Sequence, residues 1–311
     1  MATALLLDPV YKRHKTGPNH PERPERYDAV TEALTRAGLA GTLPRIEPRS
    51  ASEEELALCH DRPYIQLARN EVAGGARELT TGDTTVCADS YEVAALAAGG
   101  VLNAVDAVFS GEARNAFCAV RPPGHHATPD RGMGFCLFNN VAIAARYAQR
   151  KYGVERVLIA DWDVHHGNGT QDIFYRDGSV FFFSTHQSPW YPGTGHTDET
   201  GEGKGAGATK NCPFPAGSGH AEIVGAFSRT LVQAAQSFRP DFVLISAGFD
   251  SRLDDPLGRF TLVDEDFATL TRLVREIAEQ HAGGRLVSVL EGGYRLSGLA
   301  SAVASHVQAL V

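Results

Sequence analysis

Two carboxylates and an imidazole recur at every second position directly after a predicted buried strand. Asp161, Asp163 and His165 follow the apolar run 156–160, whose β-branched residues indicate a strand buried on both faces. While the chain stays extended, side chains two residues apart leave it on the same face. Carboxylate oxygens and an imidazole nitrogen that converge in this way can hold a divalent metal ion. The alternative is an acidic loop that caps the following helix, and the spacing alone leaves both interpretations open.

Further polar side chains also follow predicted strands. These are His125 and His126 after 115–120, Ser184-Thr185-His186 at the end of 180–184, Asp250 after 242–246, and Tyr294 after 286–290. The carboxyl ends of parallel strands share one edge of a sheet, so residues distant in sequence can meet there. Asp163, His165 and Asp250 would then be three protein ligands with a position left open, as a catalytic metal site requires. The shared edge favours the metal site over the helix cap.

A bound dication lowers the pKa of its water and polarises a carbonyl, so the chemistry expected of this site is hydrolysis. The adjacent His125 and His126 supply a base, because a histidine titrates near neutral pH. Asp161 can hold the far nitrogen of one imidazole and so fix its tautomer. Tyr294, between Gly293 and Arg295, can donate its phenol to an oxyanion.

Strands and helices alternate along the chain, and this order positions the polar residues. Helices are expected at 25–37, 63–72, 90–109, 139–152, 221–238, 264–281 and 297–311, with a short one at 52–58 opened by a capping box of Ser52 and Glu55. A further strand is expected at 4–7, and the glycine-rich stretch 198–209 is expected to be a surface loop. The pattern predicts an α/β fold: a single domain over 1–311, with a mainly parallel multi-stranded sheet and helices on both faces.

Composition narrows the class of protein. With 43% hydrophobic and 21% charged residues, the chain has the make-up of a soluble globular protein. The net charge of −8 argues against nucleic acid as a partner. Five cysteines without a CxxC pair favour reduced thiols, and no basic segment precedes the first apolar run, so a cytoplasmic location is expected. The apolar stretch 93–109 is judged too short and too polar to span a membrane.

These residues stand in motifs by which the sequence resembles the zinc-dependent histone deacetylase family, within the arginase/deacetylase fold. The likeness is closer to the class II enzymes and the bacterial deacetylase-like amidohydrolases, and it runs from His20 to Tyr294. The motifs are Arg121-Pro-Pro-Gly-His-His126, Gly134-Phe-Cys-Leu-Phe-Asn-Asn140, Asp161-Trp-Asp-Val-His-His-Gly-Asn-Gly169, Pro192-Gly-Thr-Gly195, Ala247-Gly-Phe-Asp250, Asp255-Pro-Leu-Gly258 and Glu291-Gly-Gly-Tyr294.

The resemblance implies roles for these residues. Zn²⁺, or Fe²⁺ as the alternative metal, is held by Asp163, His165 and Asp250. The implied catalytic residues are His126 as general base and acid, His125 paired with Asp161 as its electrostatic partner, and Tyr294 as the phenol that polarises the carbonyl. A structural potassium ion is implied beside the zinc, held by Asp161, Asp163, His165, Ser184 and Thr185.

The implied substrate site is a narrow tunnel for an acyl-lysine stem. Phe135 and Tyr191 wall it, Gly134 lies at its side, Asp83 is the rim carboxylate by a loose local match, and Leu257 stands in the Asp-Pro-x-Gly segment. Two positions depart from the pattern of the family. Asn168 replaces the Asp of class I members and gives His126 a neutral partner, and Arg295 stands where Asn is common, with no evident effect.

The expected activity is hydrolysis of acetyl or another short acyl group from lysine side chains of proteins. Hydrolysis of acetylpolyamines is the alternative, but polyamine-selective relatives carry a glutamate where this chain has Leu257. An arginase-like dimanganese site is disfavoured because Gly167 stands where that motif needs a carboxylate. A non-catalytic module that binds acyl-lysine is a hypothesis of a different class. The oligomeric state stays open.

Overall fold

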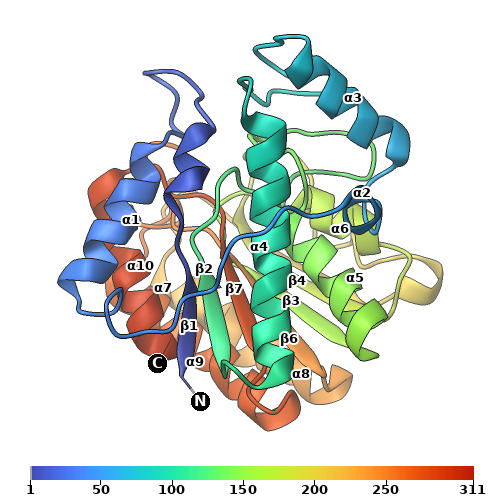
Figure 1. Ribbon diagram of the computed structural model, residues 1–311. Coiled ribbons are helices and arrows are strands. Elements are labelled where there is room, and N and C mark those ends of the chain that lie inside the picture. Colours follow the sequence, from blue (N-terminus) through green and yellow to red (C-terminus); the bar gives the residue numbers. More distant parts are fainter. Residues whose placement is uncertain (1) are drawn as a thin grey trace.

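One sheet organises the protein, and all of its strands are parallel. The computed structural model describes residues 2–311. Over these residues the sheet has seven strands in the order β1-β2-β7-β6-β3-β4-β5 (Figure 1). The strands are β1 (Thr3–Leu6), β2 (Asn115–Cys118), β3 (Val157–Asp161), β4 (Val180–Gln187), β5 (Thr209–Phe214), β6 (Phe242–Ala247) and β7 (Leu286–Leu290). The predicted α/β class with a mainly parallel sheet is confirmed.

Helices cover both faces of this sheet (Figure 1). They are α1 (Glu25–Arg36), α2 (Glu53–Leu56), α3 (Arg62–Ala73), α4 (Ser90–Ser110), α5 (Asn140–Tyr152), α6 (Asn168–Phe174), α7 (His220–Ala226), α8 (Val232–Phe238), α9 (Asp264–His281) and α10 (Leu296–Leu310). Leu158 and Ile159 are neighbours on β3, yet they belong to different hydrophobic cores, because successive side chains of a strand point to opposite faces. Ile159 packs in the core that contains α4 and α5, and Leu158 packs in the core of α9 and α10.

The predicted elements differ from the observed ones most clearly in β5, in β4 and in the helix expected at 221–238. Strand β5 was not expected, since its sequence Thr-Lys-Asn-Cys-Pro-Phe is largely polar and contains Pro213. It forms at the edge of the sheet, where a missing backbone donor is tolerated. Strand β4 continues to Gln187, three residues beyond its expected end at 184, and the helix expected at 221–238 is interrupted by a π-helical segment, Phe227–Leu231. The capping box of Ser52 and Glu55 is confirmed.

Helix α4 corrects the expectation about membrane-spanning length. It has 21 residues and is long and apolar enough to cross a membrane by length and composition, so the judgement that 93–109 is too short and too polar was wrong. However, 67% of its most apolar window is buried inside the protein, and Val101 and Leu102 are completely buried in one of the two cores. Packing against the sheet accounts for the apolar composition of this helix.

The carboxyl ends of the inner strands form one edge, and the chain places its polar residues there. Strand β3 lies between β4 and β6, and Asp161, its last residue, is paired with Ser184 on one side and Ser246 on the other. The loops that follow β3 and β6 therefore start side by side. This register brings distant segments of the sequence to one site.

Candidate active site

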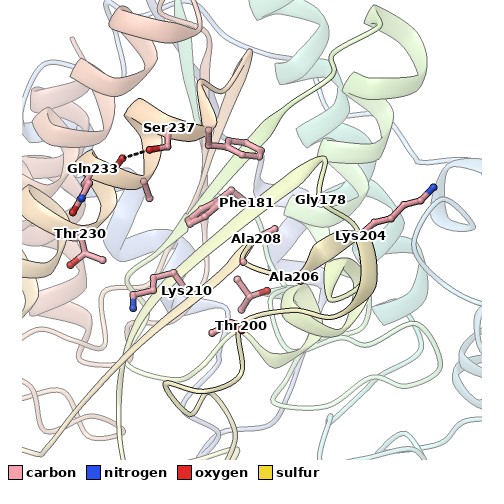
Figure 2. Close-up of a pocket in the computed structure, with 14 residues that line it drawn as sticks. Gly178, Phe181, Thr200, Lys204, Ala206, Ala208, Lys210, Thr230, Gln233 and Ser237 are labelled. Carbon is pink, nitrogen blue, oxygen red and sulfur yellow. Dashed lines mark hydrogen bonds between the residues drawn. The ribbon is translucent and has the colours of Figure 1, made fainter.

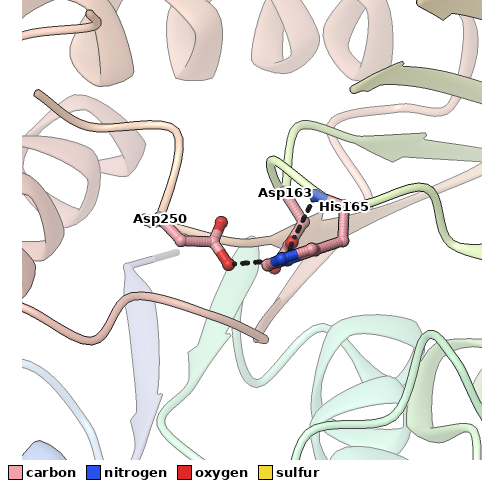
Figure 3. A group of neighbouring side chains, drawn as sticks. All are labelled: Asp163, His165 and Asp250. Atoms are coloured by element: carbon pink, nitrogen blue, oxygen red, sulfur yellow. Dashed lines mark hydrogen bonds and ion pairs between the residues drawn. The ribbon is translucent and has the colours of Figure 1, made fainter. Parts of the chain in front are cut away.

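Three buried side chains from two neighbouring strand exits meet at this edge. Asp163 and His165 follow β3, and Asp250 follows β6 (Figure 3). One candidate ligand atom from each lies within 4.8 Å of the other two. His165 Nδ1 is 3.1 Å from Asp163 Oδ1 and 3.2 Å from Asp250 Oδ2. The structure thus brings together the three residues predicted to hold a metal; their ligation of zinc stays a prediction.

The carboxylate oxygens of the cluster are suited to a divalent cation. Asp250 Oδ1 accepts the Val164 N–H at 2.9 Å, whereas its buried Oδ2 accepts no hydrogen bond from the described part of the chain. Burial, together with the charge of Asp163, raises the pKa of Asp250 to about 7. A positive ion between the two carboxylates would relieve this repulsion. A Cβ at Gly292 would collide with both carboxylates, so the glycine keeps this space open.

The two adjacent histidines lie beside this cluster and differ in charge. His125 Nδ1 is 3.0 Å from Asp161 Oδ2. Burial opposes protonation of His125, but the charges of Asp163 and Asp161 raise its pKa to about 10. His126 is also buried, and burial together with the charges of His125 and His165 lowers its pKa well below the ordinary value. The raised pKa of His125 favours an imidazolium, and the lowered pKa of His126 favours a neutral imidazole.

Asn168 fixes the tautomer of the neutral histidine. Its Oδ1 lies 2.8 Å from His126 Nδ1, and its amide group faces Met133 Sδ at 3.4 Å. With the amide placed in this way, its oxygen can only accept, so the proton of His126 resides on Nδ1 and Nε2 is free to accept another. The Asn at this position thus orients His126 without adding a negative charge.

A buried carboxylate that was not predicted as a site residue supports the histidine pair. Glu291, directly after β7, accepts the Gly124 N–H at 2.7 Å and the His125 N–H at 3.1 Å with one oxygen. Burial raises its pKa to about 7. Glu291 stands at a strand exit, as the predicted site residues do, so the rule of the shared edge could have identified it.

A pocket of about 240 Å³ opens beside the metal cluster. Its lining is Asp83, His126, Gly134, Phe135, His165, Trp190, Tyr191, Leu257 and Tyr294. The five residues predicted to bind substrate are all among them. Trp190 was not predicted; its indole N–H donates to the Leu257 carbonyl at 2.8 Å and fixes that wall. A Cβ at Gly134, whose φ is +57°, would collide with the His126 ring, so a side chain at this position would displace that ring.

Asp83 lies at the mouth of the pocket but is already engaged. Its Oδ1 accepts the Gly134 N–H at 2.7 Å and the Tyr191 hydroxyl at 3.2 Å. It therefore joins two loops of the pocket wall. This arrangement leaves only its second oxygen without a hydrogen bond from the described residues.

Of the residues predicted to hold potassium, Asp163 and His165 belong to the metal cluster itself, and Asp161, Ser184 and Thr185 lie on β3 and β4. Asp161 Oδ1 accepts the Asp163 N–H at 3.0 Å, and Ser184 Oγ is 2.9 Å from His186 Nδ1. The buried Thr185 hydroxyl has no hydrogen-bond partner among the described residues. Asp161 and Ser184 are register partners on the neighbouring strands β3 and β4. Potassium binding here stays a prediction.

A larger cavity, about 690 Å³, lies away from this chemistry (Figure 2). It adjoins the beginning of β4 at Phe181 and the helix α8 at Phe238. It contains none of the predicted site residues. The smaller pocket is therefore the candidate active site.

The fold and the site define an amide hydrolase of one family. The model of the histone deacetylase domain matches residues 20–310. The chain belongs to the histone deacetylase family, and its relatives are hydrolases that act on amides. The family is generally zinc-dependent, in keeping with the cluster of Asp163, His165 and Asp250.

Individual relatives carry several names. A probable deacetylase of Archaeoglobus fulgidus is 41% identical over 96% of this chain and 83% of its own length. A histone deacetylase-like amidohydrolase of Pseudomonas aeruginosa is 39% identical over 94% of this chain and 81% of its own length. The human polyamine deacetylase HDAC10 is 43% identical, over 93% of this chain but 44% of its own length. The crystal structure of the HDA15 HD domain matches with a TM-score of 0.94 at 36% identity, over 100% of this chain and 90% of that one.

Proposed function

We propose that this protein removes acetyl or another short acyl group from lysine side chains, with Zn²⁺, or Fe²⁺ as the alternative, held by Asp163, His165 and Asp250. One observation carries the proposal: the small pocket is lined by His126, His165 and Tyr294 together. Its volume of about 240 Å³ lies below the range typical of sites for bulky ligands. A slender aliphatic amide would fit this space.

The side chains provide the proton transfers that amide hydrolysis needs. When bound, a divalent cation in this cluster would lower the pKa of water and polarise the acyl carbonyl. His126 accepts the proton of the attacking water at Nε2, since its Nδ1 donates to Asn168. It then delivers that proton to the leaving amine. The Tyr294 hydroxyl donates to the carbonyl oxygen as negative charge develops there.

Leu257 favours a lysine substrate over a polyamine. It lines the pocket where polyamine-selective members of the family carry a glutamate. An apolar side chain at this position gives no counter-charge for a second ammonium group. The polyamine deacetylase among the relatives is the reason to keep acetylpolyamines as the second candidate.

A comparison of two substrates tests this choice. Turnover by metal-loaded protein is measured on an acetyl-lysine peptide and on acetylspermidine, and then on a panel of longer acyl groups. We expect a higher kcat/KM on the peptide and a shift toward acetylspermidine in Leu257→Glu. The matched control is Leu253→Glu, a neighbouring leucine that is 42% exposed and outside the pocket lining. A preference for acetylspermidine in the unaltered protein would contradict the proposal.

The binding-module hypothesis predicts a different result. It requires stoichiometric metal and tight acyl-lysine binding without turnover on any substrate of the panel. The neutral His126 and the position of Tyr294 in the same pocket support catalysis instead.

A further inference from the structure

One buried carboxylate outside the metal cluster connects two walls of the pocket. Asp255 Oδ2 accepts the Tyr294 N–H at 2.7 Å and the Arg295 N–H at 3.0 Å. Its Oδ1 accepts the Leu257 N–H at 3.0 Å. Asp255 is only 8% exposed. A single side chain thus holds the backbone of both Leu257 and Tyr294.

The backbone of Tyr294 depends on such an anchor. The preceding residue, Gly293, has a φ of +118°, a backbone conformation that glycine adopts more readily than other residues. The Tyr294 hydroxyl makes no hydrogen bond to the described part of the chain, and its ring is held by Phe135, with ring centroids 5.9 Å apart, and by the Arg26 guanidinium at 5.0 Å. The directional contacts that set the position of the phenol are therefore the main-chain bonds to Asp255 and the hydrogen bond that Arg26 Nε donates to the Gly293 carbonyl at 2.7 Å.

The neighbouring residues reinforce the same connection. Arg295 Nε donates to the Asp254 carbonyl, so the side chain whose effect was not evident from the sequence ties the loop after β7 to the loop that carries Asp255. Hydrogen bonds to a carboxylate are shorter and stronger than those between neutral groups. These contacts close a ring of bonds between the two loops.

We infer that Asp255 is a positioning residue, which sets the catalytic phenol of Tyr294 through two main-chain hydrogen bonds and aligns it with the Leu257 wall. The inference rests on the role proposed for Tyr294. It assigns Asp255 no contact with the substrate. Its effect on kcat is therefore expected to pass through Tyr294, whereas an effect through the Leu257 wall would appear in KM.

A double-mutant cycle tests this dependence. In Asp255→Asn one oxygen is replaced by an amide donor, so the side chain cannot accept at both Leu257 and Tyr294. A misplacement of a reacting group by about 1 Å can cost about 100-fold in rate. We expect kcat to fall about 10- to 100-fold on the acetyl-lysine peptide, with KM within about twofold, and less than about a twofold further loss when Asp255→Asn is added to Tyr294→Phe.

Controls separate positioning from damage to the fold. Asp254→Asn makes the same change one residue away, at an exposed residue, and should leave kcat unchanged. The backbone φ of Asp254 is +67°, a conformation that Asn also adopts. Metal content and the midpoint of thermal unfolding are measured for each variant, and Asp255→Glu, which keeps both acceptor oxygens, should recover part of the rate.

The outcomes distinguish the inference from the function on which it rests. If Tyr294→Phe alone leaves turnover unchanged, the role of the tyrosine fails and the inference falls with it. If Tyr294→Phe lowers kcat while Asp255→Asn does not, only the inference is overturned. Equal fold-losses from Asp255→Asn with and without the tyrosine hydroxyl would also overturn it, because the aspartate would then act by another route.

Discussion

Glu22 is predicted to contribute more to stability than any single surface ion pair. Its carboxylate is completely buried and accepts two hydrogen bonds from Arg121, the one from Nη2 at 2.7 Å, and one from Arg26 Nη1 at 3.1 Å. Both arginines are also completely buried. Burial alone would raise the pKa of Glu22, but the charge of Arg121 and the nearby His14, whose Nε2 lies 3.5 Å from Glu22 Oε2, hold it well below the ordinary value. The charged carboxylate is therefore the form that the fold requires.

The magnitude follows from what a substitution would leave behind. Glu22→Gln removes the negative charge and turns an amide donor toward guanidinium donors, so the cations of Arg121 and Arg26 lose their counter-charge inside the protein. Breaking a buried pair in this way costs about 3–5 kcal/mol. Since domains have about 5–15 kcal/mol of stability in total, this is a large fraction of it. Arg26 also donates to the carbonyls of Glu291 and Gly293, so turnover should fall as well.

Urea unfolding followed by circular dichroism measures the effect. The control is Glu92→Gln, which breaks an exposed ion pair with Arg13 and should leave the midpoint unchanged. The direction of the pH dependence provides a second check. Because the folded pKa of Glu22 is lowered, its contribution is present above the unfolded pKa of about 4.3 and is lost as pH falls through the folded pKa. A loss of stability as small as that of the control would refute the assignment of Glu22 as a buried counter-charge.

Three further predictions concern the site and the core. Tyr294→Phe should lower kcat about 100- to 1,000-fold with the metal retained, as judged by steady-state rates and metal analysis; unchanged turnover would remove the phenol from the reaction. Chelation should abolish hydrolysis and added Zn²⁺ should restore it, whereas Asp250→Ala should bind substoichiometric metal; full activity after exhaustive chelation would contradict the metal site. His60 stays neutral because Nδ1 faces the Thr128 carbonyl and Nε2 accepts the Asn139 N–H, and burial lowers its pKa to about 4. Its contribution to the free energy of unfolding is complete above pH 6.5 and should be lost at about 1.4 kcal/mol per pH unit between pH 6.5 and 4. Unfolding measured across that range should show a smaller slope in His60→Gln.

The sheet could be predicted because its inner strands are buried on both faces and so appear as continuous apolar runs. Val157–Asp161 and Leu286–Leu290 are of this kind, and the side chains on both are completely or nearly completely buried. The edge strand Thr209–Phe214 lacks that signal, since several of its side chains are only partly buried. Buried polar residues at the end of Val180–Gln187 concealed the true length of that strand. Ser184 is paired with His186 and Gln187 with the Arg259 N–H, and such pairing cannot be recognised from composition.

The candidate site residues could be predicted because the family motifs stand where the predicted strands end. Asp255, which acts through the main chain and does not stand directly after a strand, could not. It accepts hydrogen bonds from backbone N–H groups, and every residue except proline carries such a group, so no pair of side chains in the sequence marks the contact. Trp190 was missed for a similar reason, since its indole donates to the carbonyl of Leu257.

These contacts explain why so many carboxylates gather at one edge of the sheet. The loops beyond the strands are irregular, so their N–H groups need acceptors other than a neighbouring strand. Asp250 accepts from Val164, Asp163 accepts from Gly292, and Glu291 accepts from Gly124. Each bond ties the exit of one strand to that of another, but together they concentrate negative charge in a buried volume. The raised pKa values of Asp250 and Glu291, both about 7, express that cost. A divalent cation in the cluster would offset it, so the same ion would serve both hydrolysis and the cohesion of the loops that hold His125, His126 and Tyr294 in place.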